Sequence, residues 1–298
     1  MTTPLEPSES HWRDWIAAIR VPTLPAAVVP VLVGTALAVA GRHFRPGVFV
    51  ATVAASLLIQ IGTNLANDYF DFQSGADDHT RVGPRRITAG RGETVLRAAL
   101  ATFGAAAALG VYLSIVGGWP ILLIGLASIL AGIAYTGGPY PLGYHGLGDL
   151  FTFVFFGVLA VCGTYYLQTG SLSSVAVLAS VPVGCLVTAI LVVNNIRDAD
   201  TDRVAHKMTL AAALGRPFAR AEYDVLVLGS YVFPISMLAL GAATPWLFWL
   251  PFLSLPLALL LIRTVATTDQ GPPLNRALRG TGRLHLMFGS LFALSLLK

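Results

Sequence analysis

Two short windows of the sequence concentrate carboxylate and amide side chains. Four aspartates lie within Asp68–Asp78 and three within Asp198–Asp202, so these windows hold seven of the chain's 15 acidic residues. Asn67 precedes the first group and Asn194 precedes the second. Because only 11% of the residues are charged, less than half the usual fraction in a soluble domain, this clustering indicates a functional site.

The spacing within each window places oxygen-bearing side chains on one helix face, because residues four apart are neighbours on a helix. The residues related in this way are Asn67 and Asp71 in the first window and Asn194, Asp198 and Asp202 in the second. Converging carboxylates repel one another unless cations lie between them. Mg²⁺ takes oxygen ligands and leaves positions for phosphate oxygens, so these five residues are predicted to hold Mg²⁺. Asp78 and Asp200 fall outside this spacing and are expected to lie away from the site.

Basic residues are interleaved with the acidic ones. They are Arg81, Arg85, Arg86, Arg197, Arg203 and Lys207. Metal ions and basic groups beside an apolar interior suit a lipid diphosphate, whose hydrocarbon tail would lie among the helices. Breaking the allylic C–O bond of such a molecule leaves a carbocation, which a dry cavity protects from water. The predicted chemistry is therefore transfer of a prenyl group to an electron-rich acceptor.

The elements that must position these residues are apolar helices. The chain has 55% hydrophobic residues and a mean hydropathy of +0.71, which excludes a soluble enzyme, a disordered chain and an extracellular disulfide scaffold. Nine apolar stretches are each about long enough to cross a bilayer. They run over 21–40, 47–66, 94–116, 119–135, 150–168, 171–193, 223–240, 245–262 and 283–297. We expect an all-α, polytopic integral membrane protein with about nine transmembrane helices around a central cavity.

The distribution of basic residues predicts the orientation of these spans. With the N-terminus in the cytoplasm, 16 Lys and Arg residues fall on the cytoplasmic side and 3 on the other side. Both acidic windows then lie on the cytoplasmic face of the cell membrane. Residues 1–20 are expected to form a cytoplasmic or interfacial segment without a cleaved signal peptide, and residues 21–298 a single transmembrane domain. Cys162 and Cys185 lie in apolar runs, where neither a disulfide nor a metal site is expected.

A stretch rich in glycine and tyrosine, from Tyr135 to Asp149, joins two of the spans. One interpretation is an ordinary connection built from turns. The other is a tight lid over the cavity, in which Tyr135, Tyr140 and Tyr144 form aromatic walls or donate hydrogen bonds. In that case Asp149 orients the acceptor or the loop.

Three stretches of the sequence resemble the UbiA-type family of intramembrane aromatic prenyltransferases. They are Asn64-Leu-Ala-Asn-Asp-Tyr-Phe-Asp71 with Asp77 and Arg85 after it, the stretch from Ala134 to Asp149, and Asn194-Asn-Ile-Arg-Asp-Ala-Asp-Thr-Asp202 with Lys207 after it. The resemblance extends from Ile19 to the C-terminus. The second stretch lacks a basic segment, and in this it is similar to the branch of the family that acts on 1,4-dihydroxy-2-naphthoate.

The resemblance implies Mg²⁺, a polyprenyl diphosphate donor and 1,4-dihydroxy-2-naphthoate as acceptor, in a membrane and without nucleic acid. The implied products are demethylmenaquinol, an intermediate of menaquinone biosynthesis, together with CO₂ and diphosphate. The implied metal ligands are Asn67, Asp71, Asn194, Asp198 and Asp202. The residues expected to bind the diphosphate or the acceptor are Asn67, Asp68, Asp77, Arg85, Asn194, Arg197 and Tyr135. The residues expected to take part in catalysis are Asp71, Asp198, Asp202, Lys207, Tyr144 and Asp149.

Two positions depart from the family's pattern. Gly75 stands where the first motif often has a third polar residue, and Asp77 is expected to substitute for it. His206-Lys207-Met208-Thr209 stands where the family commonly has Gly-Lys-Arg-Thr, so that one basic group is missing.

The sequence leaves two other functions open. One is prenyl transfer by the same fold to another acceptor, such as 4-hydroxybenzoate, homogentisate or haem. The choice of acceptor depends on the shape of the cavity, which a sequence does not display. A cation-coupled transporter predicts acidic residues near the middle of the membrane and an inverted repeat, whereas both acidic windows lie at helix ends on one side. The chain length of the donor and the oligomeric state do not follow from the sequence.

Overall fold

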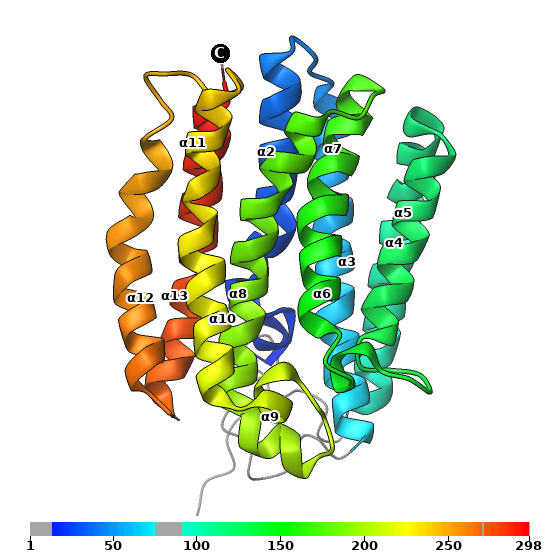
Figure 1. Cartoon of the computed structure of the whole chain (residues 1–298). Helices are drawn as coiled ribbons and strands as arrows, with labels where there is room; N and C mark the ends of the chain where they lie inside the picture. The colour runs from blue at the N-terminus through cyan, green and yellow to red at the C-terminus, as the bar shows by residue number, and fades with distance from the viewer. Residues whose placement is uncertain (1–13, 75–90, 270, 298) are drawn as a thin grey trace, which may run out of the picture.

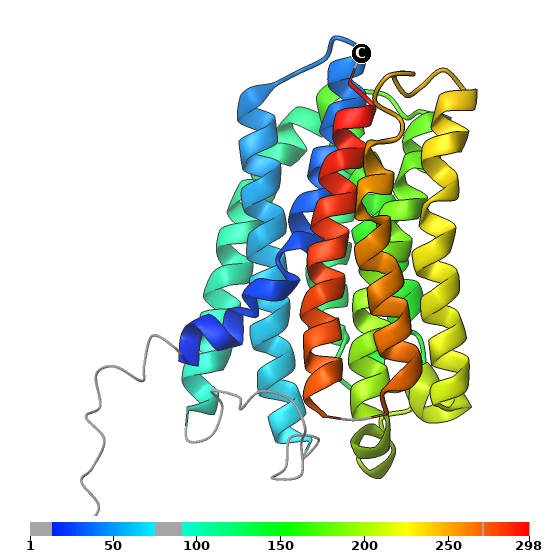
Figure 2. The same cartoon turned by 90° about the vertical axis from the view of Figure 1, so that its left-hand side faces the viewer.

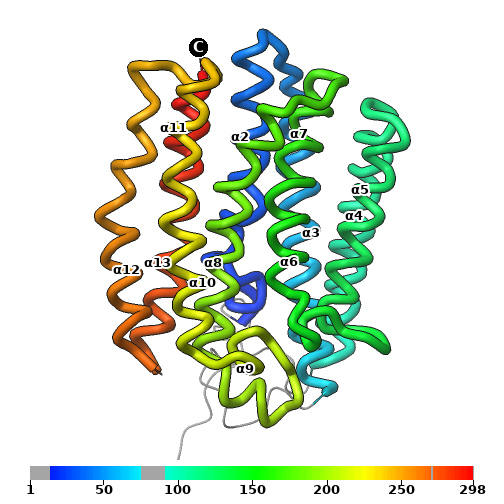
Figure 3. Tube along the Cα trace, viewed as in Figure 1, coloured from blue at the N-terminus to red at the C-terminus, as the bar shows by residue number. Residues whose placement is uncertain are grey.

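The computed structural model describes residues 14–74, 91–269 and 271–297, and every regular element in them is helical (Figure 1). In chain order the elements are η1 (Val21–Thr23), α2 (Pro25–Ala40), α3 (Pro46–Gln73), α4 (Gly92–Gly117), α5 (Trp119–Ala134), η2 (Leu142–Tyr144), α6 (Gly148–Thr152), the π-helical η3 (Phe153–Leu159), α7 (Ala160–Thr169), α8 (Ser174–Val204), α9 (Leu210–Leu214), α10 (Arg216–Ser230), α11 (Val232–Ala239), η4 (Leu250–Ser254), α12 (Leu255–Thr267) and α13 (Pro272–Ser295). The long helices run side by side in one bundle (Figures 1 and 3). The predicted all-α fold is confirmed in these residues.

Six helical segments of the described chain are long and apolar enough to cross a membrane. They are α3, α4, Gly148–Thr169 (α6, η3 and α7), α8, Arg216–Ala239 (α10 and α11) and Leu250–Thr267 (η4 and α12). A seventh arises if α2 is joined to the preceding helix Asp14–Thr23, from which it is bent by 40°. The expected nine are not confirmed. The 16 residues of α5 span about 24 Å, less than the ~30 Å of a hydrocarbon core, and α13 carries three arginines among its 24 residues.

The two helices that carry the acidic windows continue past the ends expected for their spans. α3 ends at Gln73 instead of Ala66, and α8 ends at Val204 instead of Val193. Ser173 caps the start of α8, where its hydroxyl accepts a hydrogen bond from the backbone N–H of Val175 at 3.2 Å. The described part of the first window and the whole second window therefore lie on helices, as the four-residue spacing predicts.

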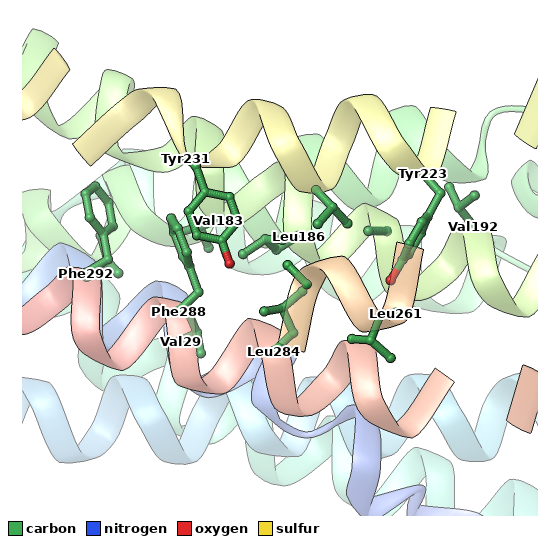
Figure 4. Packing of buried hydrophobic residues seen from close by; sticks show 14 of the residues in the cluster. Val29, Val183, Leu186, Val192, Tyr223, Tyr231, Leu261, Leu284, Phe288 and Phe292 are labelled. Carbon is green, nitrogen blue, oxygen red and sulfur yellow. The ribbon is translucent and has the colours of Figure 1, made fainter. Parts of the chain in front are cut away.

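The largest apolar core joins α2, α7, α8, α10, α12 and α13 (Figures 2 and 4). The ring of Tyr231 packs edge-on against that of Phe288, with 5.2 Å between their centroids. The hydroxyls of Tyr223 and Tyr231 lie within 2.9 Å of Thr281 and 2.7 Å of Ser254, respectively. Because these buried polar groups are paired, the core packs without unsatisfied hydroxyls at these tyrosines. Four helices of this core, α2, α7, α8 and α13, also line the cavity described below, together with α3, α4 and α5.

Two glycines bring η3 and α8 into direct backbone contact. A Cβ on Gly157 would lie 2.5 Å from the Cα of Gly184. We expect Gly157→Leu to destabilise the fold by about 1–3 kcal/mol, because the added side chain forces the two helices apart. Gly104→Ala is the matched control, since a Cβ there meets nothing within 4 Å. Thermal unfolding in detergent measures the difference, and equal midpoints for the two variants would contradict it.

Candidate active site

An elongated cavity of about 690 Å³ lies between the helices and reaches the ends of α3 and α8 that carry the acidic windows. The polar and charged residues of this end are Arg20, Asn64, Asn67, Asp68, Asp71, Tyr135, Thr136, Asn194, Asn195, Arg197, Asp198, Thr201, Asp202, Lys207, Asn275 and Arg279. The opposite end is lined by Thr52, Leu113, Ile121 and Leu167. Thr52 and Asp71 lie 19 residues apart on α3, so the cavity extends over about 28 Å. The predicted central cavity is therefore present.

The five predicted metal ligands all line this cavity. They are Asn67 and Asp71 on α3 and Asn194, Asp198 and Asp202 on α8. Asp200, which lies between two of them in sequence, does not line the cavity. It is exposed and pairs with Arg216 at 2.8 Å. The four-residue spacing thus separates the residues that face the cavity from the one that faces away.

Three aspartates of the cavity form ion pairs with basic residues. Asp68 pairs with Arg20, which no sequence motif singled out. Asp202 lies 3.8 Å from the Lys207 ammonium. Each of these three carboxylates is therefore paired with a basic side chain. The same basic side chains would attract a bound phosphate.

The third pair, between Asp198 and Arg197, is almost completely buried. The guanidinium binds the carboxylate through two hydrogen bonds, of 2.5 and 2.7 Å. It also donates to the side-chain oxygens of Asn194 at 2.8 Å and Asn275 at 3.1 Å. Arg197 thus orients two predicted metal ligands and ties them to α13.

Two residues of the Tyr135–Asp149 stretch hold the ligands of α3. The hydroxyl of Thr136 donates to the side-chain oxygen of Asn67 at 2.9 Å. The hydroxyl of Tyr144 donates to a carboxylate oxygen of Asp71 at 3.0 Å. Burial and the charge of Asp71 raise the pKa of Tyr144, so the phenol keeps the proton that it donates. Burial, with the charge of Asp149 second, likewise raises the pKa of Tyr135.

Two residues predicted to be catalytic do not line the cavity. Tyr144 contacts the site through its hydrogen bond to Asp71 and through the Lys207 ammonium, which lies 5.5 Å from the centre of its ring. It lines a separate cavity of about 470 Å³ beside Tyr140 and His145. Asp149 is buried at the start of α6, and one of its carboxylate oxygens has no hydrogen-bond partner among the described residues. Asp77 and Arg85 lie outside the described residues, as do Arg81, Arg86 and Asp78.

The donor set fits Mg²⁺ in its chemistry, because every predicted ligand offers a carboxylate or amide oxygen. No three His, Cys, Asp or Glu residues of the described chain are gathered closely enough to hold an ion by themselves. Mg²⁺ usually binds one or two carboxylates and completes its shell with water and substrate phosphates. The residues present therefore suit an ion that arrives with, or is completed by, a diphosphate.

Several residues of the cavity carried no signal in the sequence. Arg20 lies 48 residues before its partner Asp68, and Asn275 lies 78 residues after its partner Arg197. Phe151, Phe155 and Phe156 line the cavity on α6 and η3, and the rings of Phe151 and Phe155 stack with 5.8 Å between their centroids. The contacts of Arg20 and Asn275 join segments that are distant in the chain, so periodicity within one stretch did not indicate them.

A bundle of apolar helices around a cavity with a charged end and an apolar end is the arrangement of a multi-pass membrane protein. Residues 27–290 match the UbiA prenyltransferase family, and the chain belongs to this family.

Two relatives and one solved structure illustrate the similarity. The chain is 35% identical to the 1,4-dihydroxy-2-naphthoate octaprenyltransferase of Bacillus subtilis (strain 168), over 92% of this chain and 89% of the relative. It is 37% identical to the enzyme of the same name from Mycobacterium leprae (strain TN), over 92% of each chain. A UbiA homolog from Archaeoglobus fulgidus bound to DMAPP and Mg²⁺ superposes with a TM-score of 0.68, over 95% of this chain and 99% of that one, at 12% identity. At that identity the structural likeness concerns the fold.

Proposed function

We propose that the chain transfers a polyprenyl group from polyprenyl diphosphate to 1,4-dihydroxy-2-naphthoate and thereby makes demethylmenaquinol, CO₂ and diphosphate. Two relatives at 35% and 37% identity act on that acceptor by name. The observation that carries the proposal is the cavity, whose charged end suits a diphosphate and whose apolar length suits a prenyl chain.

The charged end has the groups needed to hold a diphosphate with Mg²⁺. We propose Asn67, Asp71, Asn194, Asp198 and Asp202 as the ligands, supported by the Mg²⁺ and DMAPP bound in the solved homolog. When bound, Mg²⁺ would neutralise the charge that develops on the leaving diphosphate. Arg197 and Lys207 lie beside two of the ligands and stabilise the same charge.

The rest of the cavity keeps the reacting carbon dry. As the allylic C–O bond breaks, its electron pair leaves with the diphosphate, and the prenyl carbon becomes a cation. The rings of Phe151, Phe155 and Phe156 present apolar, electron-rich surface to the cavity, which excludes water and stabilises the cation. The acceptor ring then forms the C–C bond, and loss of its carboxyl group as CO₂ restores the aromatic ring.

We further propose that the charged end of the bundle faces the cytoplasm in the cell membrane. The support is the distribution of basic residues in the sequence, in which the predicted topology assigns 16 Lys and Arg residues to the cytoplasmic side and 3 to the other side. A polyprenyl diphosphate would then enter with its charged end on the cytoplasmic side and its tail among the helices.

Product analysis of the purified protein tests the acceptor. We expect rapid prenylation of 1,4-dihydroxy-2-naphthoate with a polyprenyl diphosphate and Mg²⁺, and release of one CO₂ for each product formed. The same incubation is repeated with 4-hydroxybenzoate and with homogentisate. Prenylation of either one in preference to the naphthoate would overturn the proposed acceptor while leaving the prenyltransferase class intact.

A further inference from the structure

Two glycines lie in the wall of the cavity at the same depth. Gly110 is in α4 and Gly125 is in α5, and both line the cavity. The two helices are joined through Gly118 and run back alongside each other (Figure 1). Gly110 is eight residues before Gly118 and Gly125 is seven residues after it, so each lies about 11 Å along its helix from this turn.

Each glycine is at the centre of the helix face that lines the cavity. The residues three and four positions away, on both sides of Gly110 and of Gly125, also line it. They are Ala106, Ala107, Leu113 and Ser114 on α4 and Ile121, Leu122, Ser128 and Ile129 on α5. Because residues at these spacings share one helix face, a side chain in place of either glycine would point into the cavity. A Cβ at either position meets no atom within 4 Å, so the cavity is open in front of both.

Helix packing does not explain these two glycines. At Gly132, also in α5, a Cβ would lie 2.4 Å from Oγ1 of Thr63, so the missing side chain lets α5 approach α3. A glycine within a helix is destabilising relative to alanine, and at Gly132 this close approach is a sufficient reason for it. Gly110 and Gly125 have no such neighbour. What they provide is space within the cavity.

The depth of this space can be compared with the length of a prenyl chain. Thr136 donates to Asn67 at the charged end, and Gly125 lies 11 residues before Thr136, which corresponds to about 16 Å along α5. A prenyl unit adds four chain bonds, or about 5 Å when extended, since three bonds of an extended chain span about 3.6 Å. About three units therefore separate the charged end from the two glycines. The cavity continues past them to Leu113 and Ile121.

We propose that Gly110 and Gly125 determine the length of the donor, because their missing side chains let a chain of more than about three prenyl units extend to the far end of the cavity. This inference rests on the proposed function, since it takes the ligand to be a prenyl diphosphate, and it adds that the donors are long-chain ones. A large side chain at this depth would shorten the apolar part of the cavity and leave the charged end unchanged.

Steady-state kinetics of the purified full-length protein, with Mg²⁺ and 1,4-dihydroxy-2-naphthoate, tests the proposal with donors of two and of five prenyl units. We expect the wild type to use both donors, with kcat/KM values within about tenfold of each other. In Gly110→Phe and in Gly125→Phe, kcat/KM for the five-unit donor is expected to fall by at least about tenfold relative to that for the two-unit donor. The ring then occupies the space that the longer chain needs, whereas the shorter chain ends before it.

Gly104→Phe is the matched control. Gly104 is also in α4 and a Cβ there also meets nothing within 4 Å, but the residue does not line the cavity. This variant must keep the wild-type ratio between the two donors. Thermal unfolding in detergent shows which variants are folded, and Gly110→Leu and Gly125→Leu replace any cavity variant that is not.

Three outcomes overturn the inference. They are an unchanged ratio in a folded cavity variant, an equal loss of activity with both donors, and a wild type that uses only the two-unit donor. A purely structural role of the glycines predicts the second of these, because a distorted fold does not distinguish chain lengths. A wild type that forms no product with either donor overturns the proposed function instead.

Discussion

Asp198→Asn is expected to lower kcat for prenyl transfer by at least about 100-fold, whereas Asp200→Asn leaves it within about twofold. Asp198 lines the cavity and is nearly buried beside Arg197. Asp200 is two residues away on the same helix, exposed, and paired with Arg216. The two substitutions remove the same charge from the same helix, so their difference reports the position of the carboxylate and excludes net charge as the cause.

The expected loss at Asp198 follows from the charge that the reaction develops. Departure of the diphosphate requires cations close to its oxygens, and an amide holds Mg²⁺ much less firmly than a carboxylate does. Asn keeps an oxygen that accepts a hydrogen bond from Arg197, so the substitution preserves much of the local geometry. It nevertheless leaves a buried guanidinium without its counter-charge, which is destabilising.

The stability of the variant therefore has to be measured beside its activity. Thermal unfolding in detergent shows whether Asp198→Asn is folded at the assay temperature. Asp71→Asn is a second variant for the same purpose, because its amide oxygen still accepts the hydrogen bond that the Tyr144 hydroxyl donates. Near-wild-type kcat in a folded Asp198→Asn or Asp71→Asn would contradict the role of these carboxylates.

The sequence predicted the parts of the site that depend on local periodicity. The four-residue spacing placed Asn194, Asp198 and Asp202 on one face of α8, and Asp200 on another. This works because a helix fixes the relative directions of its side chains whatever packs against it. The class of fold followed from composition for a similar reason, since apolar stretches of this length form helices in a membrane.

Helical periodicity and composition did not predict the contacts that join segments distant in the chain. Arg20 was taken as part of an interfacial segment, yet it lines the cavity and pairs with Asp68. Arg20 meets Asp68 because the chain bends between Arg20 and α2. The hydroxyl of Thr23 stabilises this bend by donating a hydrogen bond to the backbone oxygen of Arg20. Hydropathy alone records nothing of such a bend.

The expected count of nine spans is not confirmed for a related reason. An apolar stretch was counted as a span by its length, but α5 contains only 16 helical residues. Its chain turns at Tyr135, and the residues after it fold back so that Thr136 reaches Asn67. The end of α5 is therefore set by the contacts of the site, which a count of apolar residues does not contain.

Removal of divalent cations is expected to abolish prenyl transfer, and added Mg²⁺ is expected to restore it. The oxygen donors of α3 and α8 surround the charged end of the cavity, and a diphosphate brought there without metal would meet the carboxylates of Asp71, Asp198 and Asp202. Activity with EDTA, and its recovery on titration with Mg²⁺, measures the dependence. Full activity in excess EDTA would exclude the proposed role of the metal.

The loss in EDTA is expected to concern turnover and not folding. Asp198 is paired with Arg197, and Asp202 with Lys207, so these carboxylates are compensated within the protein itself. The thermal midpoint in EDTA should therefore stay close to that in Mg²⁺ when no donor is present.

Tyr144→Phe refines the test, because it removes the hydrogen bond that orients Asp71. It is expected to raise the Mg²⁺ concentration for half-maximal activity by about 10-fold without abolishing transfer.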